Sequence, residues 1–128
     1  MEKFIHQDII LGVKIATCNP GTTPLTVGDE PLQLLTLNHP KKTKLVNHLH
    51  APKKRTVKFA ETCFVVKKGR IKLLLYSANK DFVTSVILKA GDIFLTFNGS
   101  GHGVEFLLDS EVAEIKNGPF IEDKVLID

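Results

Sequence analysis

The stretch 61-ETCFVVKKGRIKLLLYSANKDFVTSVILKAGDIFLTF-97 decides the fold class. Short runs of β-branched, leucine and phenylalanine residues alternate with Gly-, Asn- and Asp-containing turns such as KKG, SANKD and KAGD. Each run has the length of a strand and is bounded by turn residues. The stretch predicts successive strands over 61–67, 70–77, 82–89 and 92–97.

The same pattern continues on both sides of this stretch. It predicts further strands over 32–37, 43–50, 103–108 and 111–116. No segment shows an amphipathic helical stripe with caps. Many short strands with tight connections indicate an antiparallel all-β sandwich or barrel.

The first 30 residues are less regular. Residues 8–17 (DIILGVKIAT) are compatible with one strand, and residues 18–31 are rich in Pro, Gly and Thr. We therefore expect residues 1–30 to form an arm with at most one strand, packed on the barrel or on a partner in a homodimer. Residues 31–128 are expected to form a single barrel.

Length and composition agree with one soluble domain. The chain has 128 residues, of which 43% are hydrophobic and 24% charged, so disordered and collagen-like classes are excluded. No secretory signal and no apolar run of about 18 residues is visible, so we expect a cytoplasmic protein without a membrane partner. Cys18 and Cys63 have no C-x-x-C partner, and both are expected to be free, with Cys63 packed among the strands.

The charge is unevenly distributed, although the net charge is only +3. Residues 31–60 contain no acid, whereas the charged residues of 105–128 are mostly acids. The basic region is either a rim that attracts anionic ligands or an ordinary solvated surface. With one tyrosine, no tryptophan and no recognition motif, the chain is not expected to bind nucleic acid. The cations of residues 31–60 are Lys41, Lys42, Lys44, Lys53, Lys54, Arg55 and Lys58.

His48 and His50 are candidate metal ligands. In a strand, residues i and i+2 point to the same face and lie about 6.5 to 7 Å apart, so the two imidazoles can converge on one ion. The alternative is two exposed or hydrogen-bonded histidines without a shared ligand.

The segment 91-GDIFLTFNGSGHGVEF-106 resembles the second signature of the cupin family, G-x5-P-x-G-x2-H-x3-N, in Gly91, Gly99 and His102. The first signature, G-x5-H-x-H-x(3,4)-E-x6-G, is similar to the segment that holds His48, His50 and Gly69. The resemblance implies a double-stranded β-helix, which is a jelly-roll barrel. The chain departs from the signatures at Lys42, Phe97 and Phe106, where the family has glycine, proline and asparagine.

The resemblance implies that His48, His50 and His102 bind a divalent transition metal. Zinc, iron, manganese, nickel and copper all accept imidazole ligands, so the metal is not specified. The glutamate position of the first signature falls on Thr62, with Glu61 one residue earlier. Neighbouring residues point to opposite faces of a strand. If Thr62 points inward, the metal ligands are the three histidines alone. If a bulge turns Glu61 inward, its carboxylate is added to the ligand set. A degenerate cupin without metal is the remaining alternative.

Several other residues are candidates for substrate binding. Arg55 and Lys58 follow the H-x-H segment and are expected either to bind anions at the barrel mouth or to be solvated. Thr62, Phe64 and Tyr76 are candidates for the lining of the interior, although simple packing also accounts for the aromatic residues.

Three functions follow from the resemblance. The first is a metal-dependent enzyme for a small polar or anionic substrate, with a sugar or nucleotide-sugar derivative favoured and isomerisation, epimerisation or dioxygenation as its chemistry. The second is a metal-free sugar-nucleotide isomerase that uses His48 and His50 as acid and base. The third is a non-catalytic module that binds a ligand.

Overall fold

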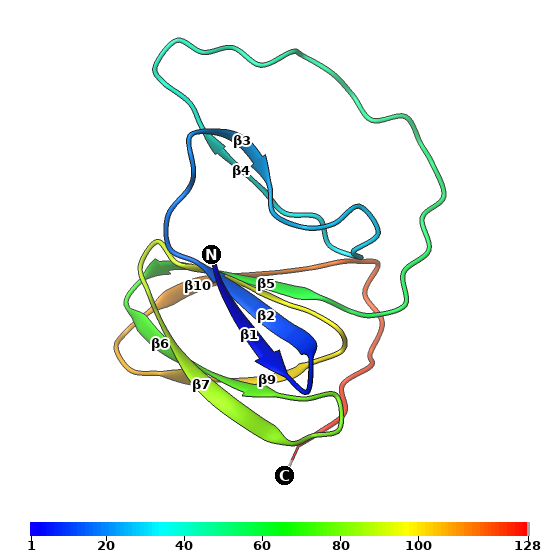
Figure 1. The fold of residues 1–128 in the computed structure, drawn as a ribbon, viewed down its shortest axis with the longest axis vertical. Coiled ribbons are helices and arrows are strands. Elements are labelled where there is room, and N and C mark those ends of the chain that lie inside the picture. Colours follow the sequence, from blue (N-terminus) through cyan, green and yellow to red (C-terminus); the bar gives the residue numbers. More distant parts are fainter. Residues whose placement is uncertain (128) are drawn as a thin grey trace.

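The computed structural model describes residues 1–127, which form ten strands and no helix (Figure 1). Within this range no helix has the length and apolar character needed to cross a membrane. The strands are β1 (Glu2–His6), β2 (Ile9–Ile15), β3 (Gly21–Pro24), β4 (Leu35–Asn38), β5 (Thr62–Lys68), β6 (Arg70–Tyr76), β7 (Phe82–Lys89), β8 (Ile93–Thr96), β9 (Gly101–Phe106) and β10 (Glu111–Lys116).

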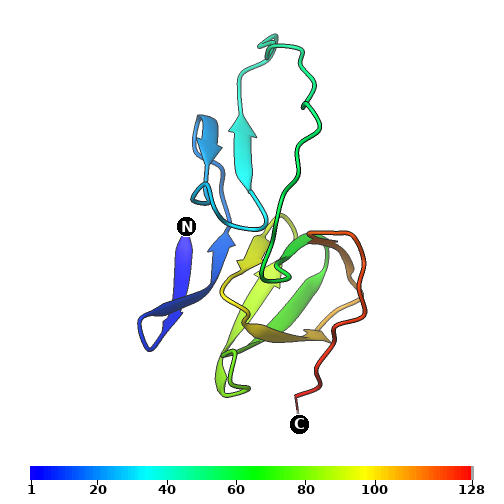
Figure 2. The ribbon, with the colours of Figure 1, turned by 90° about the vertical axis from the view of Figure 1, so that its right-hand side faces the viewer.

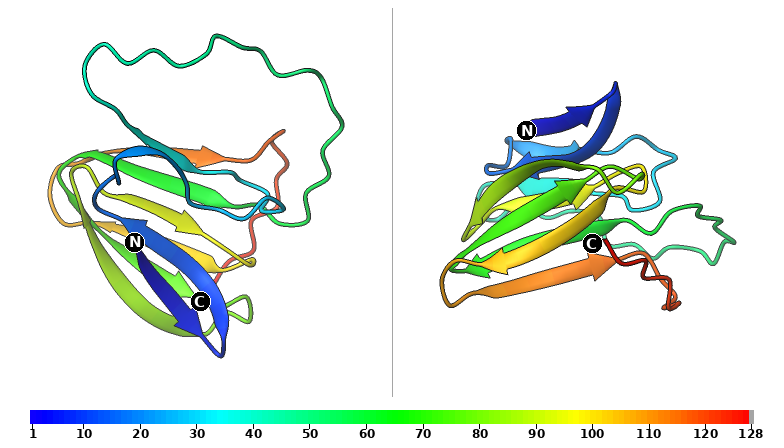
Figure 3. Two further views of the ribbon diagram at one scale, coloured as in Figure 1. Left: turned by 45° about the horizontal axis from the view of Figure 1, so that its top comes forward. Right: turned by 90° about the horizontal axis from the view of Figure 1, so that it is seen from below.

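The strands form one large sheet, one smaller sheet and a separate hairpin. The large sheet has the order β1-β2-β8-β5-β10, the smaller sheet has the order β7-β6-β9, and β3 pairs with β4. All pairings are antiparallel. The expected all-β antiparallel class is therefore correct. Within residues 1–127 no strand pairing joins the large sheet to the smaller sheet, so these two sheets form an open sandwich rather than a closed barrel (Figure 3).

Each face of the five-stranded sheet covers a separate hydrophobic core. The core between the two sheets contains Phe64 and Phe94 from the large sheet and Leu73 and Leu88 from the small one. The core on the opposite face contains Cys63 and Leu95, and it is covered by Leu25, Leu32 and Leu34 in and beside the β3–β4 hairpin. The strict alternation along β5 thus sends successive side chains into different cores.

The predicted strands from residue 61 onward are confirmed as β5 to β10, and no end differs from its prediction by more than two residues. The strand expected within 32–37 is present as β4, and the one expected within 8–17 is present as β2. Residues 1–30 nevertheless contribute more than a single strand, because β1 and β3 are also present. Cys63 is a buried free thiol, as expected.

The predicted strand over 43–50 is wrong. Residues 41–60 contain no strand, and all of their side chains are exposed. In Figures 1 and 2 this segment is a long open loop between β4 and β5 that stands away from the sandwich. The alternating residues 43–50 have no neighbouring strand among residues 1–127, and an unpaired strand is not stable in water.

Gly69, in the turn between β5 and β6, has a φ of 89°. A Cβ atom there would also collide with the side chain of Ser110 and the carbonyl oxygen of Asp109. We expect Gly69→Ala to lower the free energy of unfolding by about 3 kcal/mol, measured by urea denaturation. Gly28→Ala is the matched control, because a Cβ at Gly28 meets no atom within 4 Å. An equal loss in both variants would contradict the steric explanation.

Candidate functional site

His102 is the one predicted metal ligand that lies in the interior of the sandwich. It belongs to β9 and pairs with Leu75, a buried residue of the core between the sheets. Its ring lies edge-on to Phe64, with 5.0 Å between the ring centroids. Residues directly opposite in a ladder share a face, so the position of Leu75 directs His102 toward the interior.

The two nitrogens of His102 lie in different surroundings. Nδ1 is buried and has no hydrogen-bond partner among the described residues. Nε2 lies 3.9 Å from Oε1 of Glu114 on β10. Burial lowers the pKa of His102, and the carboxylate of Glu114 opposes this shift. A neutral imidazole with an unused ring nitrogen is the form that can bind a metal or accept a proton.

Glu114 and Lys116 extend this cluster along β10. The ammonium nitrogen of Lys116 lies 3.6 Å from Oε1 of Glu114. Glu114 pairs with Phe64, and Lys116 pairs with Thr62, so both start from the face that carries His102. The cluster is partly exposed, with 29% of the His102 side chain and 41% of the Glu114 side chain accessible. Glu114 and Lys116 were not among the candidates from the sequence, although their i, i+2 spacing on a predicted strand placed them on one face.

Thr62 and Phe64 are both buried and occupy the inward positions of β5. The backbone N–H of Thr62 donates to Oγ1 of Thr96 at 2.9 Å. Phe64 belongs to the core between the sheets and forms one wall beside His102. Both residues therefore lie on the side of the large sheet that faces the core between the sheets.

Glu61 lies on the other face of the large sheet, and only 1% of it is exposed. Its Oε1 accepts a hydrogen bond from the backbone N–H of Leu32 at 3.1 Å, and Leu32 belongs to the cover of the second core. Its Oε2 has no partner in the part of the chain that the structure describes. Burial raises the pKa of Glu61 to about 8, and the neighbouring carboxylate of Glu30 adds to the shift. The carboxylate thus stays on the face opposite His102, without the bulge that would have turned it inward.

His48 and His50 belong to the exposed loop of residues 41–60, and this loop stands away from β9 in Figures 1 and 2. Their rings are close to each other, with 5.1 Å between centroids in an edge-to-face arrangement. Nδ1 of His48 lies 2.8 Å from the carbonyl oxygen of Val46. The structure therefore brings the two histidines of the H-x-H segment together and leaves them apart from His102. Within residues 1–127, no group of three or more His, Cys, Asp or Glu side chains is placed to hold a metal ion.

Arg55 and Lys58 also lie in the exposed loop and make only local contacts. The Arg55 guanidinium donates to the carbonyl oxygen of Lys53 at 3.4 Å, and the Lys58 ammonium lies 5.4 Å from the centre of the Phe59 ring. Tyr76 alternates with the buried Leu75 along β6, and its ring packs against Phe82 instead of lining the interior. These three residues are therefore not gathered around His102.

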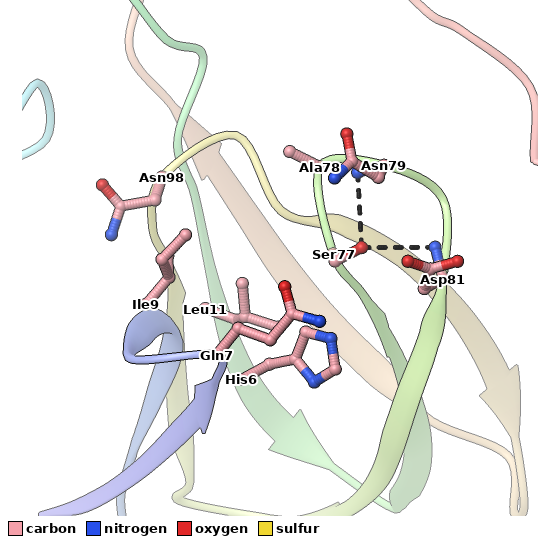
Figure 4. Close-up of a pocket in the computed structure, with 9 residues that line it drawn as sticks. All are labelled: His6, Gln7, Ile9, Leu11, Ser77, Ala78, Asn79, Asp81 and Asn98. Carbon is pink, nitrogen blue, oxygen red and sulfur yellow. Dashed lines mark hydrogen bonds between the residues drawn. The ribbon is translucent and has the colours of Figure 1, made fainter.

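A separate small cavity of about 70 Å³ lies where three turns meet at one end of the sandwich (Figure 4). In one of these turns, Oγ of Ser77 accepts hydrogen bonds from the backbone N–H groups of Asn79 and Asp81, each at 3.3 Å. The lining of the cavity contains none of the predicted site residues. The lining consists of His6, Gln7, Ile9, Leu11, Ser77, Ala78, Asn79, Asp81 and Asn98.

The fold and the cluster around His102 define the chain as an antiparallel β-sandwich with a histidine–carboxylate pair at its open side. Comparison with protein-family models, with curated proteins and with solved structures finds no match.

Proposed function

We propose that this chain is a small cupin-type jelly-roll protein that binds a divalent transition metal through His48, His50 and His102. The observation that carries the proposal is the buried Nδ1 of His102, which faces the interior without a partner among the described residues. Because an unpartnered buried nitrogen is costly, a ligand at that position would be stabilising. The edge-to-face rings of His48 and His50 are a second pair of donors of the same type.

Within residues 1–127 of a single chain, the three histidines are not arranged to bind one metal ion. His48 and His50 are exposed on the loop and lie apart from His102. A metal centre therefore requires the exposed loop to change its position. When bound by three imidazoles, a divalent metal would keep open positions for water or substrate.

A small polar or anionic molecule is the substrate class that we propose, with a sugar or nucleotide-sugar derivative favoured. The support is the charge of the loop that carries the H-x-H segment, where Arg55 and Lys58 are exposed cations. Phosphate groups are recognised by such cations through charge-assisted hydrogen bonds. If the loop moved so that His48 and His50 reached His102, Arg55 and Lys58 would move toward the same side of the sandwich.

Metal analysis of protein purified without a histidine tag tests the proposal. We expect about one first-row transition metal per chain in the wild type, and loss of most of it in His48→Ala and in His102→Ala. His39→Ala is the control, because His39 is an exposed histidine that contacts Thr22 on the β3–β4 hairpin. Metal that persists in His102→Ala, or a wild type without metal, would contradict the proposal.

A second candidate is a metal-free isomerase that works by acid–base catalysis. The observation that favours it is the 3.9 Å approach of Glu114 to His102, since a carboxylate beside a neutral imidazole is a common arrangement for proton transfer. In this function His48 and His50 would act as acid and base on a sugar nucleotide. Metal-free protein that binds a nucleotide sugar, and loses this binding in His48→Ala, would favour it over the metal centre.

A further inference from the structure

The exposed loop, defined as residues 41–58, is attached firmly at both ends and touches little in between. Before it, His39 Nε2 lies 2.8 Å from the hydroxyl of Thr22 on the β3–β4 hairpin. After it, the side chain of Asn117 donates to the carbonyl oxygen of Phe59 at 3.1 Å and accepts from the backbone N–H of Glu61 at 2.7 Å. Every residue from 41 to 58 is exposed. A structureless loop of this length in a compact domain is typical of a segment with a binding role.

The composition of the exposed loop favours an acidic and partly apolar partner. It carries seven cations and no acid. Val46 and Leu49 are each 83% exposed, and Leu45 is 51% exposed. Exposing several large apolar residues in one segment is unfavourable unless another surface covers them. Residues 43–50 also keep the pattern of a strand, and no strand of residues 1–127 pairs with them.

The matching surface, called here the acidic edge, consists of residues 105–115 in β9, β10 and their connection. Its acids are Glu105, Asp109, Glu111 and Glu114. Lys72 lies 3.1 Å from Glu105 and Lys116 lies 3.6 Å from Glu114, whereas Asp109 and Glu111 have no ion pair among the described residues. Phe106 is 64% exposed, and Leu108 is 58% exposed. β9 and β10 are the last strands of their sheets, so within residues 1–127 one side of each ladder has no neighbouring strand. The acidic edge thus offers free acids, exposed apolar side chains and edge backbone groups that complement the cations, the apolar side chains and the unpaired backbone of the exposed loop.

We propose that the exposed loop of one copy docks on the acidic edge of a second copy, with residues 43–50 added as a strand beside β10, and that the exchange is reciprocal. The exposed loop of this chain stands away from its own sandwich, which leaves its surface open to another copy (Figure 2). Eighteen residues span up to about 60 Å when extended, which is ample for a strand beside β10. In a two-fold dimer, the exposed loop of each copy would contact the acidic edge of the other copy in the same way.

The exchange also completes the proposed metal centre. Glu114 on β10 lies beside His102, so a strand added at this edge would carry His48 and His50 toward the His102 of the other copy. This part of the inference rests on the proposed function, whereas the docking rests on charge and exposure alone. Each site would then contain two histidines from one copy and one from its partner.

The docking is tested by sedimentation of the full chain. We expect a mass of twice the 14.2 kDa chain at low salt, and at least tenfold weaker dimerisation in Glu111→Lys or at high salt. Combining Glu111→Lys with Lys44→Glu should restore much of the loss, whereas combining it with Lys3→Glu on β1 should not. A monomeric wild type, or a dimer indifferent to these changes, would overturn the docking.

The shared site is tested by heterodimers. A His48→Ala/His50→Ala chain and a His102→Ala chain are co-expressed with different tags that lack histidine, and the mixed dimer is isolated through both tags. A site shared between copies leaves one intact centre in each mixed dimer, so the metal content should be about half that of the wild type.

The possible failures are distinguishable. If the wild type binds metal and the mixed dimer binds none, the centre forms within one chain and the shared site is wrong. If the wild type binds no metal, the proposed function fails, and the sedimentation result alone decides whether the exposed loop docks on a second copy.

Discussion

Raising the pH from about 6 to about 9 is expected to destabilise the wild-type protein more than a Glu61→Gln variant. Burial holds the pKa of Glu61 at about 8, against an ordinary value of 4.5, so the folded protein keeps this carboxyl protonated over much of that interval. The unfolded chain releases the proton above 4.5, and folding therefore becomes less favourable as the pH rises toward 8. At about 1.4 kcal/mol for each pH unit between pH 6 and the folded pKa, the loss over this interval amounts to about 3 kcal/mol.

Urea denaturation of both proteins across this pH range measures the difference. The glutamine side chain of the Glu61→Gln variant would keep an amide oxygen for the N–H of Leu32 and carries no ionisable proton, so the stability of the variant should depend less on pH. Glu30→Gln is an informative second variant, because Glu30 contributes to the raised pKa and its removal should weaken the pH dependence. Parallel stability profiles for the wild type and Glu61→Gln would show that Glu61 is ionised in the folded protein.

Phe94→Ala is expected to cost about 4 kcal/mol of unfolding free energy, which is a large share of the stability of a domain of this size. Phe94 is fully buried at the centre of the large sheet. Its ring packs against Phe4 with 5.6 Å between centroids and lies directly over Gly12 on β2. Alanine would leave a cavity where β1, β2 and β8 meet.

Urea denaturation of Phe94→Ala beside Phe82→Ala provides the comparison. Phe82 is 57% exposed on β7, and its truncation should cost less than about 1 kcal/mol. Gly12→Ala should also be destabilising, because a Cβ there would lie 2.5 Å from the Phe94 ring. The double variant Gly12→Ala/Phe94→Leu should lose less than the sum of the single changes. Equal costs for Phe94→Ala and Phe82→Ala would contradict the assigned core.

The strands from residue 61 to residue 116 were predictable because their signals are local. Alternating apolar residues define the face of each strand, and turns such as that at Gly69 define where each strand ends. The same alternation over 43–50 gave a wrong prediction. The pattern concerns side chains alone, whereas a strand also needs backbone hydrogen bonds to a neighbouring strand. No strand of residues 1–127 lies beside residues 43–50.

The candidate site was predictable only in part. The alternation along β5 left open whether Glu61 faces away from Phe64 or is turned inward by a bulge, and the structure puts Glu61 on the opposite face. The burial of Glu61 was not predictable, because the segment around Leu32 that covers it lies far away in the sequence. The approach of Glu114 to His102 depends in the same way on the packing of two separate sheets.

The sequence by itself determined the all-β class and most of the strands, because these follow from the residue pattern along the chain. Only the tertiary structure decided which residues meet across the sheets. It placed a carboxylate beside His102, buried Glu61 in a second core and left His48 and His50 on an exposed loop. The physical reason is that such meetings depend on how the strands pair and how the sheets pack, which no local pattern contains.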